Sequence, residues 1–212
     1  MPYHDPQPVR IFCIGRNYAE HAKELQNEVP GQPVIFMKPP SALVLPGQPI
    51  SMPKHGKDLQ HEVELVVKIG NHGRAATMQA ARNMITGLSL GLDLTLRDLQ
   101  LNLKTKGLPW EMAKAFDGSA PVGYFTPLTS KLDLGNIDLC CEVNGQLRQL
   151  GNTGDMIFPV EQLVIAISAI WKLRPGDLIY TGTPAGVGSL KVGDIVTLKS
   201  PQLGRFSWNV LA

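Results

Sequence analysis

Two glutamates separated by one residue lie in an apolar run, residues 61–67 (HEVELVV). Because the side chains of a strand alternate between its faces, Glu62 and Glu64 would share one face, roughly 6.5–7 Å apart along the strand. Glutamate is uncommon in strands, and two like charges on one face repel each other unless a positive charge lies between them. By itself, the pattern is equally typical of a half-buried strand whose other face is solvated.

A third carboxylate, Asp93, lies in the apolar segment 87–96 (GLSLGLDLTL). A lone acid in such a segment is costly unless it is paired or bound to a cation. Three carboxylates on strand-like segments, without a cluster of cysteines or histidines, suit a hard cation such as Mg²⁺ or Mn²⁺. We therefore interpret Glu62, Glu64 and Asp93 as candidate metal ligands.

A histidine and a glutamate three residues apart, His21 and Glu24, would share one face of a short helix. A histidine that is oriented and made more basic by a carboxylate is a common general base near neutral pH. Such pairs are also common on helix surfaces. The catalytic interpretation therefore depends on a neighbouring metal site, where a bound substrate would need a base to activate water.

Two further segments have groups that could contact an anion. Lys114 lies in a largely apolar context and is either a snorkelling lysine at a strand edge or a cation facing the anionic end of a substrate. The glycine-rich segment 181–188 (TGTPAGVG) superficially resembles a phosphate loop but lacks the Gly-Lys-Ser/Thr ending. A turn that brings the backbone close to a small anion fits this segment better.

The composition is that of an ordinary globular protein, with 43% hydrophobic and 18% charged residues among 212. This length suits a single catalytic domain, which we expect to span residues 1–212. The net charge of +2 is small and the basic residues are dispersed, so the only support for a nucleic-acid partner is a pI near 8.4.

Features of membrane and secreted proteins are missing from the sequence. No apolar run approaches the roughly 20 residues needed to cross a bilayer, and the first residues lack the pattern of a signal peptide. Cys13, Cys140 and Cys141 are odd in number and have no metal-type spacing, which favours reduced thiols. We therefore expect a cytoplasmic location and no membrane partner.

The elements that must position these residues are mostly strands, because 21 glycines and 17 prolines punctuate short β-like runs. An Asn144-Gly145 turn predicts a hairpin. A second predicted helix would be closed by Gly87, and a third would have Pro159 at its first position. The predicted strands cover residues 11–14, 34–38, 139–143, 146–150, 178–181, 195–198 and 205–210, and the predicted helices cover 18–26, 78–86 and 159–173.

In combination, these motifs resemble the fumarylacetoacetate hydrolase family, specifically its short single-domain acylpyruvase-type members. Each matching piece is weak alone, but together they follow one another in order over essentially the whole chain. The matching segments are 15–18 (GRNY) with His21 and Glu24, 36–39, 61–64, 93–100, 106–110, 113–114, 156–158 and 181–188.

The resemblance implies a mixed, β-rich α+β fold, a β-sandwich roll with a few short helices, that usually forms homodimers. It also implies that Mg²⁺ or Mn²⁺ is held by Glu62, Glu64 and Asp93, and that His21 and Glu24 form a catalytic dyad. The positions that match the lining of the substrate pocket are Arg16, Arg97, Gln100, Lys114 and Thr183. Larger relatives have an additional N-terminal domain and a fourth acidic ligand without counterpart in this sequence, so three protein ligands must suffice.

The expected function is metal-dependent hydrolysis of a C–C bond in acylpyruvates, such as fumarylpyruvate or acetylpyruvate, through a metal-bound pyruvate enolate. Three carboxylates would leave about three positions on an octahedral ion, two of which a 2-oxo acid can fill. His21 with Glu24 would activate water, and Lys114 would stabilise developing oxyanion charge.

Other activities would use the same enolate site. Oxaloacetate decarboxylation or tautomerisation and isomerisation of 2-hydroxyhepta-2,4-diene-1,7-dioate remain alternatives, because the sequence gives no pocket volume. A non-catalytic scaffold is a further alternative, but the intact His21, Glu24 and Lys114 argue against it.

Overall fold

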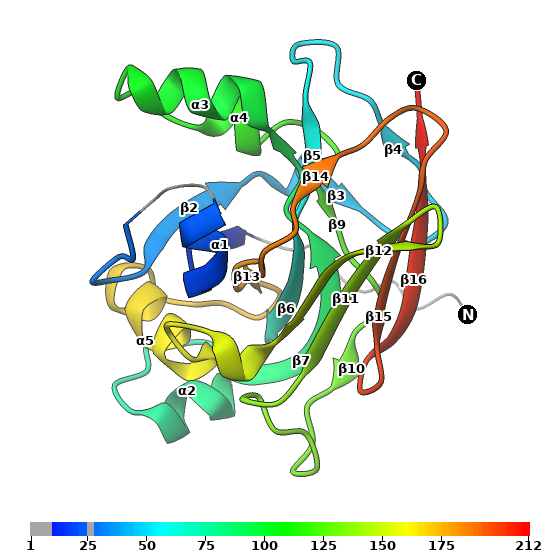
Figure 1. Cartoon of the computed structure of the whole chain (residues 1–212). Coiled ribbons are helices and arrows are strands. Elements are labelled where there is room, and N and C mark those ends of the chain that lie inside the picture. Colours follow the sequence, from blue (N-terminus) through cyan, green and yellow to red (C-terminus); the bar gives the residue numbers. More distant parts are fainter. Residues whose placement is uncertain (1–9, 25–27) are drawn as a thin grey trace.

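The computed structural model describes residues 10–24 and 28–212 (Figure 1). Its larger sheet has the strand order β10-β7-β6-β13-β1-β2, in which β1 and β13 are parallel and the other neighbours antiparallel. The strands are β1 (Ile11–Gly15), β2 (Val34–Lys38), β6 (Val63–Ile69), β7 (Ile85–Leu92), β10 (Thr126–Pro127) and β13 (Leu178–Tyr180).

A second sheet has the order β12-β11-β15-β16-β4, in which only β16 and β4 are parallel. The predicted hairpin is confirmed, with positive φ angles of 53° at Asn144 and 77° at Gly145 in its turn. The strands are β4 (Ile50–Ser51), β11 (Asp138–Val143), β12 (Gln146–Asn152), β15 (Ile195–Ser200) and β16 (Gly204–Leu211).

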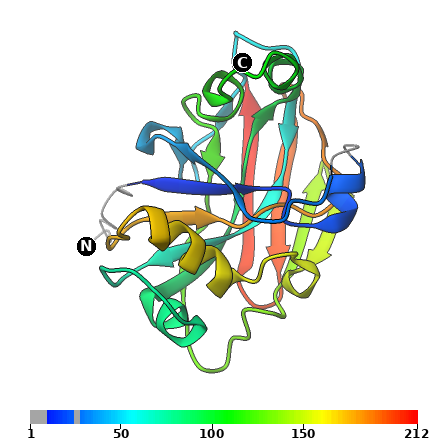
Figure 2. The ribbon, with the colours of Figure 1, turned by 90° about the vertical axis from the view of Figure 1, so that its left-hand side faces the viewer.

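The two sheets pack against each other, with β6 and β7 facing β11 and β15 (Figures 1 and 2). Val63, Leu65 and Val67 are fully buried in the main hydrophobic core, as the alternation of residues 61–67 predicts. Val66 points to the opposite face and joins a smaller cluster with Cys13 and other side chains. Strand β6 is therefore buried on both faces, within a mixed α+β fold.

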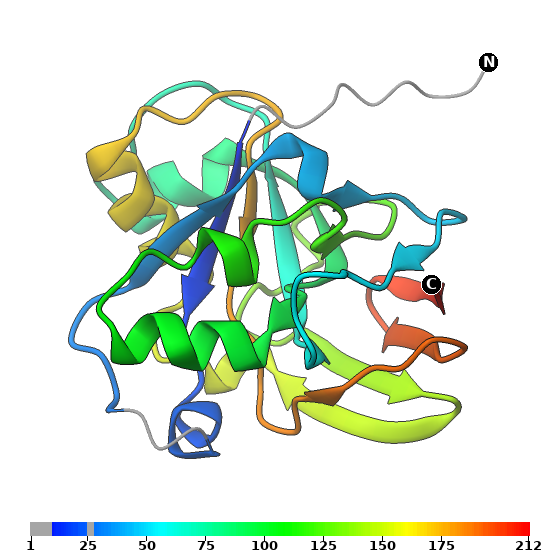
Figure 3. The same ribbon diagram turned by 90° about the horizontal axis from the view of Figure 1, so that it is seen from above.

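The helices lie at two ends of the sheets. Helices α2 (Met78–Met84) and α5 (Val160–Ile170) pack together at one end, and α3 (Arg97–Thr105) and α4 (Glu111–Lys114) at the other (Figures 1 and 3). Helix α1 (Ala19–Glu24) follows β1. None of the helices in the described part of the chain combines the length and apolar composition needed to cross a membrane.

Short strands and turns connect these parts. A three-stranded sheet has the order β14-β5-β8, and β3 pairs with β9. These strands are β3 (Leu43–Val44), β5 (Leu59–His61), β8 (Thr95–Leu96), β9 (Ala120–Pro121) and β14 (Gly188–Ser189). Two 3₁₀ turns cover Pro40–Ala42 and Thr153–Asp155.

The predicted helix over residues 78–86 is wrong at its C-terminal end. Helix α2 ends at Met84, and Gly87 lies inside β7 instead of closing the helix. Ile85 pairs with Ile69 and Gly87 with Lys68 across the neighbouring strand. Pairing with β6 thus outweighs the local helical pattern, helped by the β-branched residues that begin β7.

The other two helix predictions need correction at their ends, and one helix was missed. Helix α5 begins at Val160, after Pro159 as its N-cap, and ends at Ile170 because the chain then pairs Leu173 with Gly73. Helix α1 covers residues 19–24, and residues 25–26 of its prediction lie outside the described residues. Helix α3 was not predicted, since its leucines alternate along RDLQLNLKT with the period of a strand.

Candidate active site

Glu62 lies where the chain passes from one sheet to another. The expected continuous strand is interrupted at Glu62, because β5 pairs with β8 and β14 whereas β6 pairs with β7 and β13. Asp93 lies at the matching crossing between β7 and β8, and its backbone N–H donates to the Glu62 carbonyl at 2.9 Å. The two crossings therefore bring residues 31 positions apart side by side.

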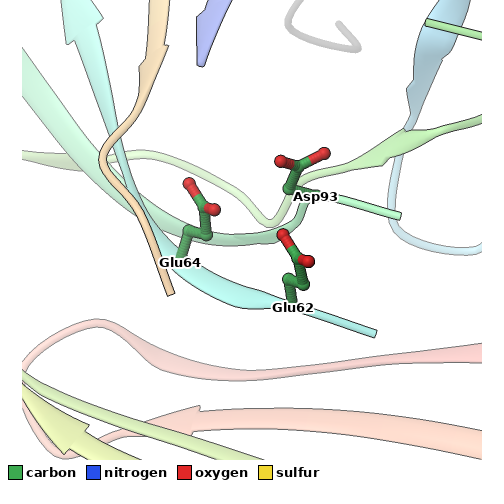
Figure 4. Close-up of side chains that lie close together, drawn as sticks. All are labelled: Glu62, Glu64 and Asp93. Carbon is green, nitrogen blue, oxygen red and sulfur yellow. The ribbon is translucent and has the colours of Figure 1, made fainter. Parts of the chain in front are cut away.

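The carboxylates of Glu62, Glu64 and Asp93 meet in one place. Each offers an oxygen, and these oxygens all lie within 4.8 Å of one another. The three residues are 4%, 1% and 1% exposed, and their carboxylates point into the same space (Figure 4). We call these residues the carboxylate triad. The residues singled out as metal ligands from the sequence are thus brought together, without Cys or His among them.

The donor set of the carboxylate triad fits a hard divalent cation. All its atoms are carboxylate oxygens, which Mg²⁺ and Mn²⁺ prefer. Lys38 Nζ lies 2.8 Å from Asp93 Oδ1. It donates hydrogen bonds to the Leu94 and Lys114 carbonyls instead, and this oxygen has no hydrogen-bond donor among the described residues. A buried carboxylate oxygen without a donor is costly, and a coordinated cation would remove that cost.

Basic side chains surround the carboxylate triad. Lys114 Nζ donates to Glu62 Oε2 at 2.8 Å and to Asp93 Oδ2 at 2.7 Å. Arg97 donates to the other oxygen of Glu62. Lys114 is 3% exposed and Lys38 2%, so both ammonium groups are buried beside negative charge. Lys38 was not singled out from the sequence, where a lysine at the end of a strand has no distinguishing pattern.

These charges shift the pKa values of the site in different directions. Burial would raise the pKa of Glu62, but Lys114 and Arg97 hold it well below its usual range. Burial, Asp93 and Glu62 together raise the pKa of Glu64 well above its usual range. Burial would lower the pKa of Lys114, but Asp93 and Glu62 outweigh it and raise that pKa. Glu62 is therefore ionised and paired, whereas Glu64 lacks a comparable cationic partner.

The His21–Glu24 pair lies over the same site. His21 Nδ1 is 3.1 Å from Glu24 Oε2, and His21 is 5% exposed. The second oxygen of Glu24 accepts a hydrogen bond from the Gly186 N–H at 3.0 Å. The glycine-rich segment 181–188 thus fixes Glu24, and its Gly182 N–H donates to Glu64 Oε2 at 2.8 Å. One loop contacts both the dyad and the carboxylate triad.

One cavity, of about 40 Å³, joins these groups. The residues singled out from the sequence all line it except Glu24, which is linked to it through His21. Arg97 also donates to Gln60 and Gln100, at 2.9 and 2.5 Å, so its guanidinium is largely engaged with protein groups. The cavity lining comprises Ile14, Gly15, Arg16, His21, Phe36, Glu62, Glu64, Asp93, Arg97, Gln100, Lys104, Trp110, Lys114 and Thr183.

Gln149 is a buried residue whose side-chain amide forms hydrogen bonds with residues at and beside the cavity lining. It was not singled out from the sequence. Its Oε1 accepts from His61 Nδ1 at 2.8 Å and from the Val63 N–H at 3.0 Å. Its Nε2 donates to Thr183 Oγ1 at 2.7 Å and to the Pro184 carbonyl at 2.9 Å. Gln149 therefore connects the start of strand β6 to the glycine-rich loop. Nothing in the sequence distinguishes it from the polar neighbours on the exposed strand β12.

Comparisons with curated proteins identify close relatives. The mitochondrial oxaloacetate decarboxylase of Dictyostelium discoideum is 46% identical over 188 residues, which cover 88% of this chain and 86% of that protein. The mitochondrial oxaloacetate tautomerase of Homo sapiens is 45% identical over 184 residues, which cover 87% of this chain and 83% of that protein.

Solved structures and a family model agree with these similarities. Fumarylpyruvate hydrolase from Pseudomonas aeruginosa, in complex with Mn²⁺ and pyruvate, is 33% identical with a TM-score of 0.91, covering 100% of this chain and 99% of that one. The model described as "Fumarylacetoacetate (FAA) hydrolase C-terminal" matches residues 10–211. The resemblance noted in the sequence is confirmed, and the chain belongs to the fumarylacetoacetate hydrolase family.

Proposed function

We propose that the protein is a divalent-metal-dependent hydrolase that cleaves the C–C bond of acylpyruvates. The observation that carries this proposal is the convergence of the carboxylate triad and the His21–Glu24 pair on one cavity. The similarity to a fumarylpyruvate hydrolase in complex with Mn²⁺ and pyruvate supports it.

In this proposal Glu62, Glu64 and Asp93 hold Mg²⁺ or Mn²⁺. The bound ion would supply a Lewis acid for the carboxylate and 2-oxo oxygens of the substrate. Lys114 and Lys38 hold the carboxylates together by offsetting their mutual repulsion. The positive charge of Lys114, which lines the cavity, also favours the negative charge that develops when the C–C bond breaks.

His21 acts as the general base. In the neutral imidazole, a hydrogen bond from Nδ1–H to Glu24 leaves the other ring nitrogen able to take a proton from water. The resulting hydroxide attacks the carbonyl distal to the 2-oxo acid group. The bond between that carbonyl carbon and C3 then breaks, and its electron pair remains on C3 as the enolate of pyruvate. The proton held by His21 returns to C3, which gives pyruvate and a carboxylic acid.

A second candidate function is oxaloacetate decarboxylation or tautomerisation. Relatives that are 45–46% identical carry these names. Decarboxylation yields the same enolate by loss of CO₂ and needs no attacking water. Tautomerisation needs only the movement of a proton between C3 and the 2-oxo oxygen, which the His21–Glu24 pair could perform. An isomerase acting on 2-hydroxyhepta-2,4-diene-1,7-dioate would use the same proton movement.

A substrate panel separates these activities. Turnover is measured for 2-oxo acids and 2,4-dioxo acids with Mg²⁺ or Mn²⁺, using product analysis that distinguishes hydrolysis, CO₂ release and enol–keto exchange. We expect acylpyruvates to be hydrolysed with the highest kcat/KM. Rapid conversion of oxaloacetate together with negligible hydrolysis of every acylpyruvate would contradict the hydrolase assignment and favour the second candidate.

A further inference from the structure

Gln149 is a fully buried polar residue on a strand that is otherwise largely exposed. It lies in the middle of β12, and both of its neighbours in the chain are exposed. Its side chain reaches the segment between β13 and β14, which includes Thr183 (Figure 1). The steps of the proposed reaction do not use this amide, so its burial needs another reason.

The backbone partners of Gln149 allow its amide only one orientation. The Val63 N–H can only donate a hydrogen bond, and the Pro184 carbonyl can only accept one. Oε1 therefore faces Val63, at 3.0 Å, and Nε2 faces Pro184, at 2.9 Å. A flipped amide would place donor against donor and acceptor against acceptor inside the protein, which is costly.

This orientation determines which hydrogen bonds the Thr183 hydroxyl can make. Gln149 Nε2 lies 2.7 Å from Thr183 Oγ1 and can only donate, so the hydroxyl oxygen accepts. The Pro184 carbonyl is a poor acceptor for the hydroxyl proton, because it is 3.4 Å away and already accepts from Gln149. Thr183 also lines the cavity. Its hydroxyl proton can therefore be donated to an anion bound there.

The backbone of this segment is held by contacts of its own. The Thr181 hydroxyl donates to the Leu65 carbonyl at 2.9 Å, and the Gly182 N–H donates to Glu64 Oε2 at 2.8 Å. Neither hydrogen bond involves Gln149. The specific effect of the Gln149 amide is therefore on the direction of the neighbouring hydroxyl, beyond its share in holding the loop.

We propose that Gln149 is a positioning residue, whose amide directs the Thr183 hydroxyl into the cavity as a donor to a carboxylate oxygen of the bound 2-oxo acid. This inference rests on the proposed function, which brings that anion to the cavity. A hydroxyl that already points in its donating direction loses little freedom when the ligand binds. A hydrogen bond to a carboxylate is also stronger than one between neutral groups. Gln149 thus increases affinity without contacting the ligand.

The test is a double-mutant cycle measured by oxalate binding in the presence of Mn²⁺. Thr183→Val removes the hydroxyl with little change in shape and should weaken oxalate binding roughly 10- to 100-fold, as for loss of a hydrogen bond to a charged group. Gln149→Met lets the hydroxyl turn to the Pro184 carbonyl and should weaken binding at least about fivefold. In Thr183→Val, adding Gln149→Met should weaken binding by less than about a further twofold, because both substitutions remove one hydrogen bond.

Further measurements separate this role from a purely structural one. Gln149→Met leaves two buried donors without their acceptor and should lower the Tm. Its Mn²⁺ affinity should stay within about twofold of the parent, because the hydrogen bonds of the amide go to residues outside the carboxylate triad. Gln149→Glu keeps the acceptor but removes the donor to Thr183, and it replaces Gln149→Met in the cycle if that variant does not fold. Gln146→Glu, at an exposed position of the same strand, is the matched control and should bind oxalate like the parent.

The same factor of loss on adding Gln149→Met to the parent and to Thr183→Val would overturn the inference, because Gln149 would then act independently of the hydroxyl. Parental oxalate affinity in either single variant would also overturn it. A parent protein that neither binds oxalate with Mn²⁺ nor turns over any 2-oxo acid would contradict the proposed function, and the inference with it. In a parent that does both, absence of coupling contradicts the inference alone.

Discussion

Buried charge dominates the site at the scale of single residues. Three carboxylates at close range repel each other, and desolvation adds to the cost of ionising them. Lys114 contacts Glu62 and Asp93, Arg97 contacts Glu62, and Lys38 lies beside Asp93. The arrangement keeps Glu62 ionised while leaving Glu64 without a comparable cationic partner and Oδ1 of Asp93 without a hydrogen-bond donor among the described residues. This imbalance is what a divalent cation would correct.

The first prediction concerns His21. His21→Ala should reduce acylpyruvate hydrolysis by roughly 10²–10⁴, the usual contribution of a general base. The variant should still bind oxalate in the presence of Mg²⁺, because oxalate engages the metal end of the cavity. Decarboxylation of oxaloacetate should suffer less, since it needs no attacking water.

Steady-state kinetics and oxalate titrations of parent and variant check this prediction. His72→Ala, which removes an exposed histidine, serves as control and should behave like the parent. Hydrolysis at the parental rate in His21→Ala would place the base elsewhere, and loss of oxalate binding would make His21 a structural residue or a ligand.

The second prediction concerns Lys114, whose removal leaves Glu62 and Asp93 facing each other. Lys114→Met should lower the free energy of unfolding of the metal-free protein by about 3–5 kcal/mol, as expected for a broken buried ion pair. Excess Mn²⁺ should recover part of this loss. Urea unfolding with and without Mn²⁺ is the measurement.

Lys199→Met is the control for this prediction, because Lys199 pairs with Glu142 at 2.5 Å but its side chain is 37% exposed. A surface pair of that kind contributes at most about 1 kcal/mol to the free energy of unfolding. Equal destabilisation by both substitutions would show that the buried charges around Lys114 do not have the energetic weight assigned to them.

At the scale of elements, the glycine-rich segment 181–188 connects the parts of the site. On one side the Asn17 side chain donates to the Thr181 carbonyl, and on the other Gln149 donates to Thr183 Oγ1 and to the Pro184 carbonyl. Its backbone N–H groups reach Glu64 and Glu24. The loop packs so closely on β12 that a Cβ on Gly186 would lie 2.2 Å from the Arg148 carbonyl oxygen. Its position therefore sets the position of both halves of the site.

Gly182 provides the test at this scale. Its φ angle is +100°, and an added Cβ would lie 2.6 Å from Asn17 Cβ. Gly182→Ala should therefore shift the loop and weaken the Gly182–Glu64 hydrogen bond. Gly193 has a φ angle of +94° with nothing within 4 Å, so Gly193→Ala adds backbone strain alone, about 1–2 kcal/mol.

Thermal unfolding and oxalate binding in the presence of Mn²⁺ compare the two variants. We expect Gly182→Ala to be the less stable protein and to bind oxalate at least about tenfold more weakly, whereas Gly193→Ala should bind like the parent. Equal oxalate affinity in both variants would contradict the role assigned to the loop.

Local sequence patterns predicted the elements whose conformation does not depend on pairing with distant parts of the chain. The alternation in residues 61–67 gives the buried face of β6, and Asn144-Gly145 gives the hairpin. Local patterns failed where tertiary pairing decides, as at Ile85, which leaves a helical pattern to pair with Ile69. The leucines of α3 alternate as in a strand, and only the packing of the segment beside α4 and β8 reveals the helix.

At the scale of the whole molecule, the site depends on two chain crossings between sheets. Glu62 and Asp93 were recognisable as unusual acids in apolar segments. They lie side by side only because the chain passes between the same two sheets at two neighbouring points, from β5 to β6 and from β7 to β8. Lys38 and Gln149 could not be singled out, because their importance comes from burial and from partners distant in the sequence. Sequence patterns identify reactive residue types, whereas the fold determines which ordinary polar residues support them.

The association state belongs to this scale. Strands β2 and β12 are edges of their sheets, and β12 exposes Leu147 and Leu150. Such edges are usually covered, and the family resemblance in the sequence implies homodimers. We predict that sedimentation gives about twice the 23.1 kDa mass of the chain. A fully active monomer whose mass does not change with concentration would show that this prediction is wrong.

The most direct test of the account is a titration of Mn²⁺ into chelator-treated protein, with turnover of a 2-oxo acid substrate measured on the same samples. The parent should be inactive without metal and regain turnover in proportion to the bound ion. Glu64→Gln should bind Mn²⁺ at least about tenfold more weakly and remain nearly inactive, while Glu20→Gln, at an exposed glutamate of α1, should match the parent. Full turnover by the metal-free parent, or parental Mn²⁺ affinity in Glu64→Gln, would contradict the account.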